Sequence, residues 1–510
     1  MRYAVRATLA VGMLAGVYLA ALGLIVASVL GLVWALEHGV SGLALGKVGI
    51  LVLLVSVALL RGLWAGLRPR RVEPGGFLLD LDAHPVLREE LAELGRQVGS
   101  RPPDEVRLVP DVNAAVSEDA RWLGLRPGTR RLYLGVPLLT GLTTAQVRSV
   151  LAHELGHYSG RHTALAGTVY RGREALHHLV TSLDRHPWVA RFFRGYTRLY
   201  DAVSRAVGRR QELEADLASA RIAGPAVAAS ALRELGPLDA AWSFFAERYV
   251  GGPRDLGRRP IDVFWGFERF LADPARQEQL EEVRATPLPA EVSPHDTHPP
   301  LAVRVAALEG LPQTRSRALP AAGLLLLGDA DATLRAFEDW LYAGSDLVAT
   351  PWDELAALTG ETQARAGAVR LGEALGEGGR VPMLADYLAH LRMGALSWRL
   401  LDLLGPDSTL DERREAGIRL LTDTVTVALI AHGAGRMRLS WAGEPKLVGP
   451  EGQLLEHEEV VEDAVRSPAA VDDLERWLDE HGVPRSFSVA DLPPAPVAPP
   501  VPQPRRPVEA

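Results

Sequence analysis

Two histidines four residues apart constrain this chain of 510 residues more than any other feature. His153 and His157 stand in the stretch LAHELGHYSGRHT, residues 151–163, and Glu154 follows the first of them. Side chains four residues apart project from one face of an α-helix, so a helix here lets both imidazoles hold the same cation. Thr143 and Gln146 form the capping-box pattern that begins such a helix. The sequence therefore predicts a helix that carries a candidate metal site.

The spacing matches HExxH, in which two histidines hold zinc and the glutamate reaches a water on the ion. A catalytic zinc needs a third protein ligand and leaves its fourth position for water. His162 comes one residue early for the longer pattern HExxHxxGxxH, so we expect it to lie outside the metal site. The stretch ELEAD offers Glu212 as third ligand and Asp216 as a hydrogen-bond acceptor for a ligating imidazole. The alternative is a pair of surface histidines and a solvated acidic helix face.

A third motif follows these two in chain order. DTHPPLAVR occupies residues 296–304, and VNAAV stands upstream at residues 112–116. With HELGH and ELEAD, these segments resemble the gluzincin metallopeptidases that include HtpX and the CAAX prenyl proteases. The resemblance covers about residues 75–310. It implies a zincin-like metallopeptidase domain, mostly helical within the α+β class, with one zinc ion per chain.

The resemblance also implies a role for each matching residue. His153, His157 and Glu212 are the implied zinc ligands, and Glu154 is the implied general base and acid. His298 is implied to help stabilise the transition state.

Further positions are implied to support the site or to meet the substrate. Asp216 would orient a zinc ligand, and Arg304 would support the site. Asn113 and Ala114 fall in the segment that lies along bound substrate in the family. The implied activity is hydrolysis of peptide bonds in protein or peptide substrates by a zinc metalloendopeptidase. The competing hypothesis is a non-catalytic, membrane-anchored scaffold or sensor that retains the metal site.

Two apolar runs precede these motifs. Residues 7–36 contain no charge, and a second run spans about residues 43–64. A helix of roughly 20 apolar residues crosses a bilayer, so the pattern predicts a transmembrane hairpin with the lipid bilayer as a partner. Arginines flank the outer ends of both runs, whereas the connecting segment has none. The positive-inside rule then predicts a multi-pass protein of the cell membrane with two transmembrane helices and a cytoplasmic catalytic domain.

Composition sets the remaining limits. Cysteine is absent, so zinc would be held by His, Asp or Glu. A net charge of -8 is mild for this length and argues against a dedicated nucleic-acid-binding protein. Residues 426–432 (TVALIAH) resemble a strand. The C-terminal region is also a candidate for binding a protein partner. We expect five segments: a transmembrane hairpin (1–72), the peptidase domain (73–311), a helical extension (312–405), an α/β region (406–491) and a disordered Pro-rich tail (492–510).

Overall fold

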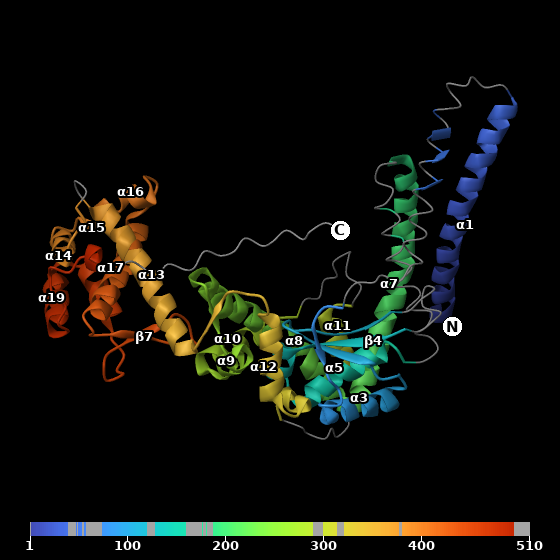
Figure 1. Ribbon diagram of the computed structural model, residues 1–510, viewed down its shortest axis with the longest axis horizontal. Helices are drawn as coiled ribbons and strands as arrows, with labels where there is room; N and C mark the ends of the chain where they lie inside the picture. Colours follow the sequence, from blue (N-terminus) through green and yellow to red (C-terminus); the bar gives the residue numbers. More distant parts are fainter. Residues whose placement is uncertain are drawn as a thin grey trace. The chain divides into compact units, whose positions relative to one another are not determined.

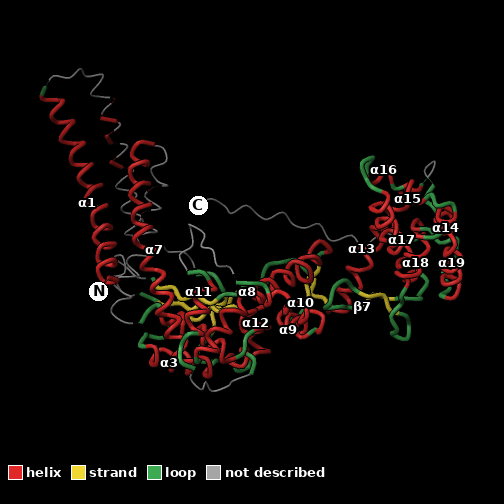
Figure 2. Tube along the Cα trace, turned by 180° about the vertical axis from the view of Figure 1, so that it is seen from behind, coloured by secondary structure: helices red, strands yellow, loops and turns green. Residues whose placement is uncertain are grey.

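The protein is mostly helical, with short strands, in the computed structural model (Figures 1 and 2). The predicted α+β, mostly helical class is confirmed. The chain divides into two compact units: unit 1 is Met1–Trp242 with Leu280–Leu341, and unit 2 is Ser243–Gln279 with Tyr342–Ala510. The structure describes residues 2–38, 74–119, 128–159, 187–288, 299–313, 321–376 and 380–493, with single positions between 47 and 57 and at 176 and 180.

Unit 1 contains a four-stranded sheet in the order β1-β2-β4-β3. Its strands are β1 (Phe77–Leu79), β2 (Glu105–Val109), β3 (Ala114–Glu118) and β4 (Arg130–Gly135). β2 and β4 run parallel, whereas β1 and β3 pair antiparallel with their neighbours. Alternate residues of the two central strands are buried, as expected when one face of a sheet covers a core. Because β3 stands last in the strand order, it forms one edge of this sheet.

The helix predicted around the histidine motif is α5 (Thr144–Gly156). The Gln146 backbone N–H donates to the Thr143 hydroxyl, and the Thr143 backbone N–H donates to the Gln146 side chain, so the predicted capping box is confirmed. The other unit 1 helices are α1 (Arg2–Glu37), α3 (Pro85–Val98), α4 (Val136–Gly141), α7 (Pro187–Ala223), α11 (Leu301–Glu309), η4 (Gly323–Leu327) and α12 (Ala330–Leu341). Both units include residues of α8 (Pro225–Phe245) and α10 (Pro274–Ala285).

The first apolar run forms α1, which lies beside α7 (Figure 1). The Tyr196 hydroxyl of α7 donates to the Met13 carbonyl oxygen at 2.6 Å, and Leu14 is buried. This turn of α1 therefore lies against α7, whereas Leu19, Leu22 and Leu30 of the same helix are more than half exposed. Among the residues described, no helix combines the length and apolar character needed to cross a bilayer.

The membrane prediction is wrong on this finding. It comprised two transmembrane helices and a multi-pass location with a cytoplasmic catalytic domain. The lipid bilayer as a partner stays a prediction. The second apolar run, residues 43–64, falls mostly outside the described residues.

Unit 2 is built around two long helices, α13 (Trp352–Leu375) and α17 (Leu410–Ala431). Residues 426–432 resemble a strand in sequence, but residues 426–431 form the last turns of α17, because their apolar side chains pack in a helical core. The other unit 2 elements are η2 (Ala246–Gly251), η3 (Gly252–Leu256), β5 (Arg258–Pro260), α9 (Val263–Ala272), β6 (Val348–Thr350), α14 (Leu384–Arg392), α15 (Leu396–Arg399), α16 (Leu401–Leu404), β7 (Arg436–Arg438), β8 (Lys446–Val448), α18 (His457–Arg466), η5 (Pro468–Ala470), α19 (Val471–Glu480) and η6 (Val489–Asp491).

The predicted segment boundaries at residues 72, 311, 405 and 491 stay predictions. In the structure, η4 and α12 belong to unit 1 although they follow residue 311. The Gly323 backbone N–H donates to the Leu142 carbonyl oxygen at 2.9 Å, and Phe337 lies 6.0 Å from Phe77 between ring centroids. Of the Pro-rich segment 492–510, the structure describes residues 492 and 493.

Candidate metal centre

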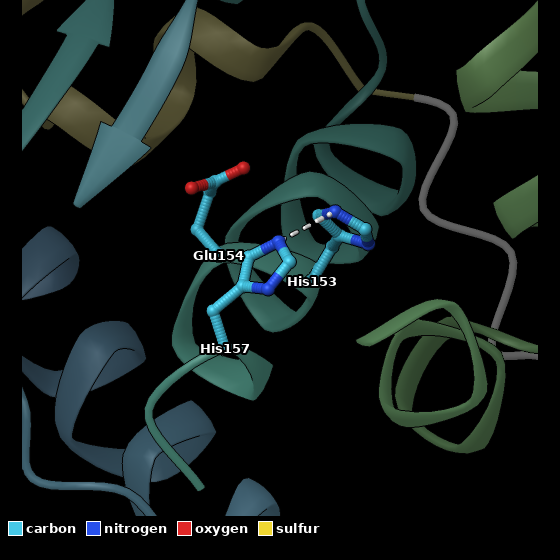
Figure 3. Close-up of side chains that lie close together, drawn as sticks. All are labelled: His153, Glu154 and His157. Carbon is cyan, nitrogen blue, oxygen red and sulfur yellow. Dashed lines mark hydrogen bonds between the residues drawn. The ribbon is translucent and has the colours of Figure 1, made fainter. Parts of the chain in front are cut away.

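His153 of α5 and His157, the residue that follows the end of this helix, face each other (Figure 3). Their Nε2 atoms are 3.1 Å apart, and their rings stand nearly perpendicular with centroids separated by 4.7 Å. Glu154 joins His153 and His157 in a group whose ligand atoms lie within 4.8 Å of one another. This convergence follows from the helical spacing of the motif.

A carboxylate from α7 completes the group. The Nε2 atoms of His153 and His157 each lie 3.6 Å from an oxygen of Glu212, whose side chain is buried. Donor atoms bound to one tetrahedral zinc at about 2.0–2.1 Å stand roughly 3.3 Å apart. The separations of 3.1 and 3.6 Å therefore fit a single small cation between the three side chains.

Small residues allow α7 to approach α5 closely. A Cβ added at Gly156 would come within 3.2 Å of the Ala215 Cα and the Ala218 Cβ. The hydroxyl oxygens of Ser149 and Ser219 lie 2.6 Å apart and form a buried hydrogen bond. This tight contact brings the Glu212 carboxylate to the histidines of the other helix.

Asp216 connects the histidines to a buried arginine. Its Oδ1 lies 3.1 Å from Nδ1 of His153, and a hydrogen there leaves the Nε2 lone pair for a cation. Arg304 of α11 donates from Nε and Nη2 to the two oxygens of Asp216 at 2.9 and 2.7 Å. Nη1 of Arg304 also lies 3.3 Å from Glu212. Arg304 therefore holds two acidic side chains of the site in place.

The acidic side chains around the histidines favour positive charge at this centre. Burial lowers the pKa of His153, but hydrogen bonds to Asp216 and Glu212 outweigh this effect and raise that pKa to about 9. Burial raises the pKa of Asp216, yet hydrogen bonds from Arg304 and His153 bring it below its usual value. The carboxylates thus favour positive charge at the imidazoles, which either a proton or a metal ion can provide.

Glu154 lies between the histidines and the β3 edge. Burial raises the pKa of its carboxyl, which accepts a hydrogen bond from the Val116 backbone N–H. The Tyr158 hydroxyl donates to the Val116 carbonyl oxygen at 2.7 Å, and the Arg130 guanidinium lies 4.6 Å from the Tyr158 ring centroid. Glu154 and Tyr158 therefore occupy both backbone groups of Val116, which leaves Ala114 as the next position on this edge.

The comparisons with known proteins agree with this geometry. Residues 85–311 match the model of Peptidase family M48. The chain carries an M48 peptidase domain. The resemblance inferred from the motifs is thereby confirmed, and the protein is a metallopeptidase by family. No curated protein and no solved structure matched the chain.

A cavity of about 380 Å³ opens onto the M48 centre. Its lining includes the residues expected to bind metal, catalyse or support the site, and also the two expected to meet substrate: His153, Glu154, His157, Glu212, Asp216, Arg304, Asn113 and Ala114. His298 and His162 lie outside the described residues. The structure therefore brings together eight of the nine residues predicted for the M48 site.

The sequence did not single out Tyr158 of the M48 domain, and it indicated Val116 only as the last residue of the VNAAV segment. Tyr158 directly follows the HELGH motif, but its partner on β3 is 42 residues away in sequence. A tyrosine at that position carries no signal by itself, because its hydrogen bond exists only when α5 packs beside β3.

Proposed function

We propose that the M48 domain is a zinc-dependent endopeptidase in which His153, His157 and Glu212 hold the metal. The observation that carries this proposal is the convergence of two imidazoles and one buried carboxylate, at 3.1 and 3.6 Å, beside a second buried carboxylate, Glu154. Three such ligands leave a fourth position for water or substrate, as catalytic zinc requires. Asp216 orients His153, and Arg304 orients Asp216.

Glu154 is the proposed general base. Zinc held by these three ligands would supply a Lewis acid for the scissile carbonyl and an acidified water. Glu154 would accept a proton from the attacking water and deliver it to the leaving amine. The raised pKa of Glu154 supports this role, because a carboxyl whose pKa lies nearer neutrality is better matched to both steps.

The β3 edge is the proposed site of the substrate backbone. Asn113 and Ala114 line the cavity, and an extended peptide can add to a free strand edge through main-chain hydrogen bonds. Because Glu154 and Tyr158 engage Val116, pairing would use Ala114 and the residues before it. His298 is proposed to stabilise the oxyanion, and this role rests on the family motif alone.

Zinc content and proteolysis of an unfolded protein such as casein test the proposal. The purified protein should contain one zinc per chain and should lose proteolysis when a chelator removes it. Glu154→Gln should keep zinc and lose activity by roughly 10²-fold or more, because it removes the general base. Glu212→Ala should lose both zinc and activity.

Two results would contradict these assignments. Full zinc occupancy in Glu212→Ala would exclude Glu212 as a ligand. Unchanged proteolysis by Glu154→Gln would exclude Glu154 as the base. A protein that binds zinc but cleaves no substrate in any form would instead support the non-catalytic scaffold.

A further inference from the structure

Alternate residues of β3 direct both of their backbone groups away from the sheet. The Asn113 carbonyl oxygen accepts a hydrogen bond from the Gly135 N–H at 2.7 Å, and the Asp119 N–H donates to the Thr129 carbonyl oxygen at 3.0 Å. In an antiparallel ladder, hydrogen-bonded pairs of this kind alternate with pairs whose backbone groups point outward. The register of β3 with β4 then gives the residues that point outward. They are Ala114, Val116 and Glu118.

Both outward groups of Val116 already have partners. Its N–H donates to the Glu154 carboxylate, and its carbonyl oxygen accepts from the Tyr158 hydroxyl at 2.7 Å. A peptide could pair with Val116 only by displacing both hydrogen bonds. One of them goes to a carboxylate, and hydrogen bonds to charged groups are the stronger kind. Val116 is therefore closed to a substrate backbone.

The Tyr158 ring is also held from its other side. The Arg130 guanidinium lies 4.6 Å from the ring centroid, within the range of a cation–π contact. Arg130 is itself buried, and it donates to Glu118 at 3.1 Å and to Ser100 at 3.0 Å. Because its hydroxyl and one ring face both contact anchored groups, Tyr158 stays at the β3 edge.

The cavity of the metal centre ends where Tyr158 meets β3. Its lining follows the chain through residues 112–115 and includes neither Val116 nor Tyr158. Within β3, Ala114 is the outward-pointing residue that borders the cavity. Main-chain pairing at this site is therefore short, because the next outward position along the strand is already occupied.

We propose that Tyr158 is a specificity-determining residue of the M48 site. It ends main-chain pairing at Ala114, so a bound peptide is extended beside Ala114 and must bend or end before it reaches Val116. This inference rests on the proposed function, which places the substrate backbone on β3. It adds the class of substrate: unfolded segments and chain ends fit this site, whereas a segment that stays extended as a long strand does not.

Peptides methylated at single backbone nitrogens test this role, because each methyl group removes one hydrogen-bond donor. The probes are fluorescein-labelled decapeptides that tile the casein sequence, and the tightest binder is then methylated at one nitrogen at a time. The full chain with bound zinc and Glu154→Gln binds these peptides without the proposed base for cleavage. Its amide oxygen at position 154 can still accept from the Val116 N–H. Fluorescence polarisation gives each Kd.

With Tyr158 present, the row of sensitive nitrogens should end at the one that pairs with Ala114. Methylation there should weaken binding by roughly tenfold or more, as expected for a hydrogen bond left unmade in a buried site. Adding Tyr158→Ala opens Val116 and should extend the row by one nitrogen, two residues further along the peptide. Methylation at this new position should weaken binding by roughly threefold or more.

Tyr133→Ala is the matched control. Tyr133 lies on the neighbouring strand β4, half-buried and outside the cavity lining. Adding this change should leave the row of sensitive nitrogens as it is with Tyr158 present. An extended row in the control would trace the effect to general loosening of the sheet and would overturn the inference.

Identical methylation patterns with and without Tyr158→Ala would also overturn it. Casein cleavage by the natural protein together with identical patterns would refute the role of Tyr158 alone and leave the proposed function standing. Failure of every tiled peptide to bind would contradict both this inference and the placement of substrate on β3. Circular dichroism and zinc content check that each variant folds. Tyr158→Leu, which keeps an apolar side chain beside Arg130, replaces Tyr158→Ala if the alanine variant fails this check.

Discussion

Asp216 occupies the most demanding position of the site at the scale of single residues. Its carboxylate is buried between the Arg304 guanidinium, at 2.7 and 2.9 Å, and the His153 ring, at 3.1 Å. A buried charge is stable only when nearby groups compensate it. Removing one partner of a buried pair leaves the other as an uncompensated charge in the protein interior. The three side chains should therefore behave as one energetic unit.

Arg304→Gln should reduce the free energy of unfolding by about 3–5 kcal/mol, the usual cost of a broken buried ion pair. Asp216→Asn should be destabilising as well, but the double variant should cost less than the sum of the two single changes. Denaturant unfolding of the four proteins gives the coupling energy. Strict additivity would mean that the pair contributes no coupled interaction.

At the scale of elements, the distance between α5 and α7 decides whether the site can form. Glu212 meets the histidines because Gly156 lies against Ala215 and Ala218 without a side chain between the helices. Ser149 and Ser219 hold the same interface at 2.6 Å. Helix packing of this kind tolerates added volume poorly, because interiors are close-packed.

Gly156→Val should push α7 away from α5 and weaken zinc binding by roughly tenfold or more, which corresponds to the 1–3 kcal/mol typical of overpacking. The change touches no proposed ligand. Competition with a chelator of known affinity measures it. Ala226→Val, at an exposed position of α8, is the control and should bind zinc as the natural protein does. Unchanged zinc affinity in Gly156→Val would show that the helix contact does not set the ligand geometry.

Asp423 gives the contact between α13 and α17 a dependence on pH. Its carboxylate lies where a Cβ on Gly367 would stand, and burial with the nearby Glu444 raises its pKa from 3.8 to about 7. A carboxyl with a raised pKa in the folded state stabilises the fold while it is protonated. That contribution is complete below about pH 4 and is lost as the pH rises through about 7.

Asp423→Asn should therefore be more stable than the natural protein at pH 8, by about 1–2 kcal/mol after allowance for partial solvation of the carboxyl. The advantage should shrink toward pH 4, where both side chains are neutral. Thermal unfolding at pH 4.5 and pH 8 measures the difference. An advantage that does not depend on pH would exclude titration of Asp423 as its cause.

At the scale of the whole molecule, the residues that complete unit 1 extend past the M48 match. The match ends at residue 311, but η4 and α12 continue the same compact unit to Leu341. Leu327 and Phe337 are fully buried, and the Thr144 backbone N–H at the start of α5 donates to the Ala321 carbonyl oxygen at 2.7 Å. The helix that carries the histidines is therefore supported by residues outside the family match.

Phe337→Ala should destabilise unit 1 by about 3–5 kcal/mol, the usual cost of a large cavity in a core. Because α12 packs against β1 and η4, the variant should also lose zinc at a lower temperature than the natural protein. Trp340→Ala is the control, since Trp340 is 43% exposed on the same helix. Equal stability of the two variants would mean that α12 does not contribute to the unit 1 core.

The sequence by itself determined the local parts of this protein. The capping box, the helical face shared by His153 and His157, and the order of the family motifs depend on residues close together in the chain. Helix periodicity and caps arise from such short-range contacts, so they can be read from one segment at a time. Glu212 and Asp216 were predicted in the same way, from their spacing on one helix.

Only the tertiary structure decided which segments meet. The 3.6 Å approach of Glu212 to both histidines, the bond from Tyr158 to Val116 and the burial of Arg304 join residues far apart in the chain. The misreading of residues 426–432 as a strand has the same cause. In sequence these residues show only that they are apolar, whereas packing in the unit 2 core makes residues 426–431 the last turns of α17. Apolar burial is non-directional, so a hydrophobic run specifies that it will be covered but not by which partner.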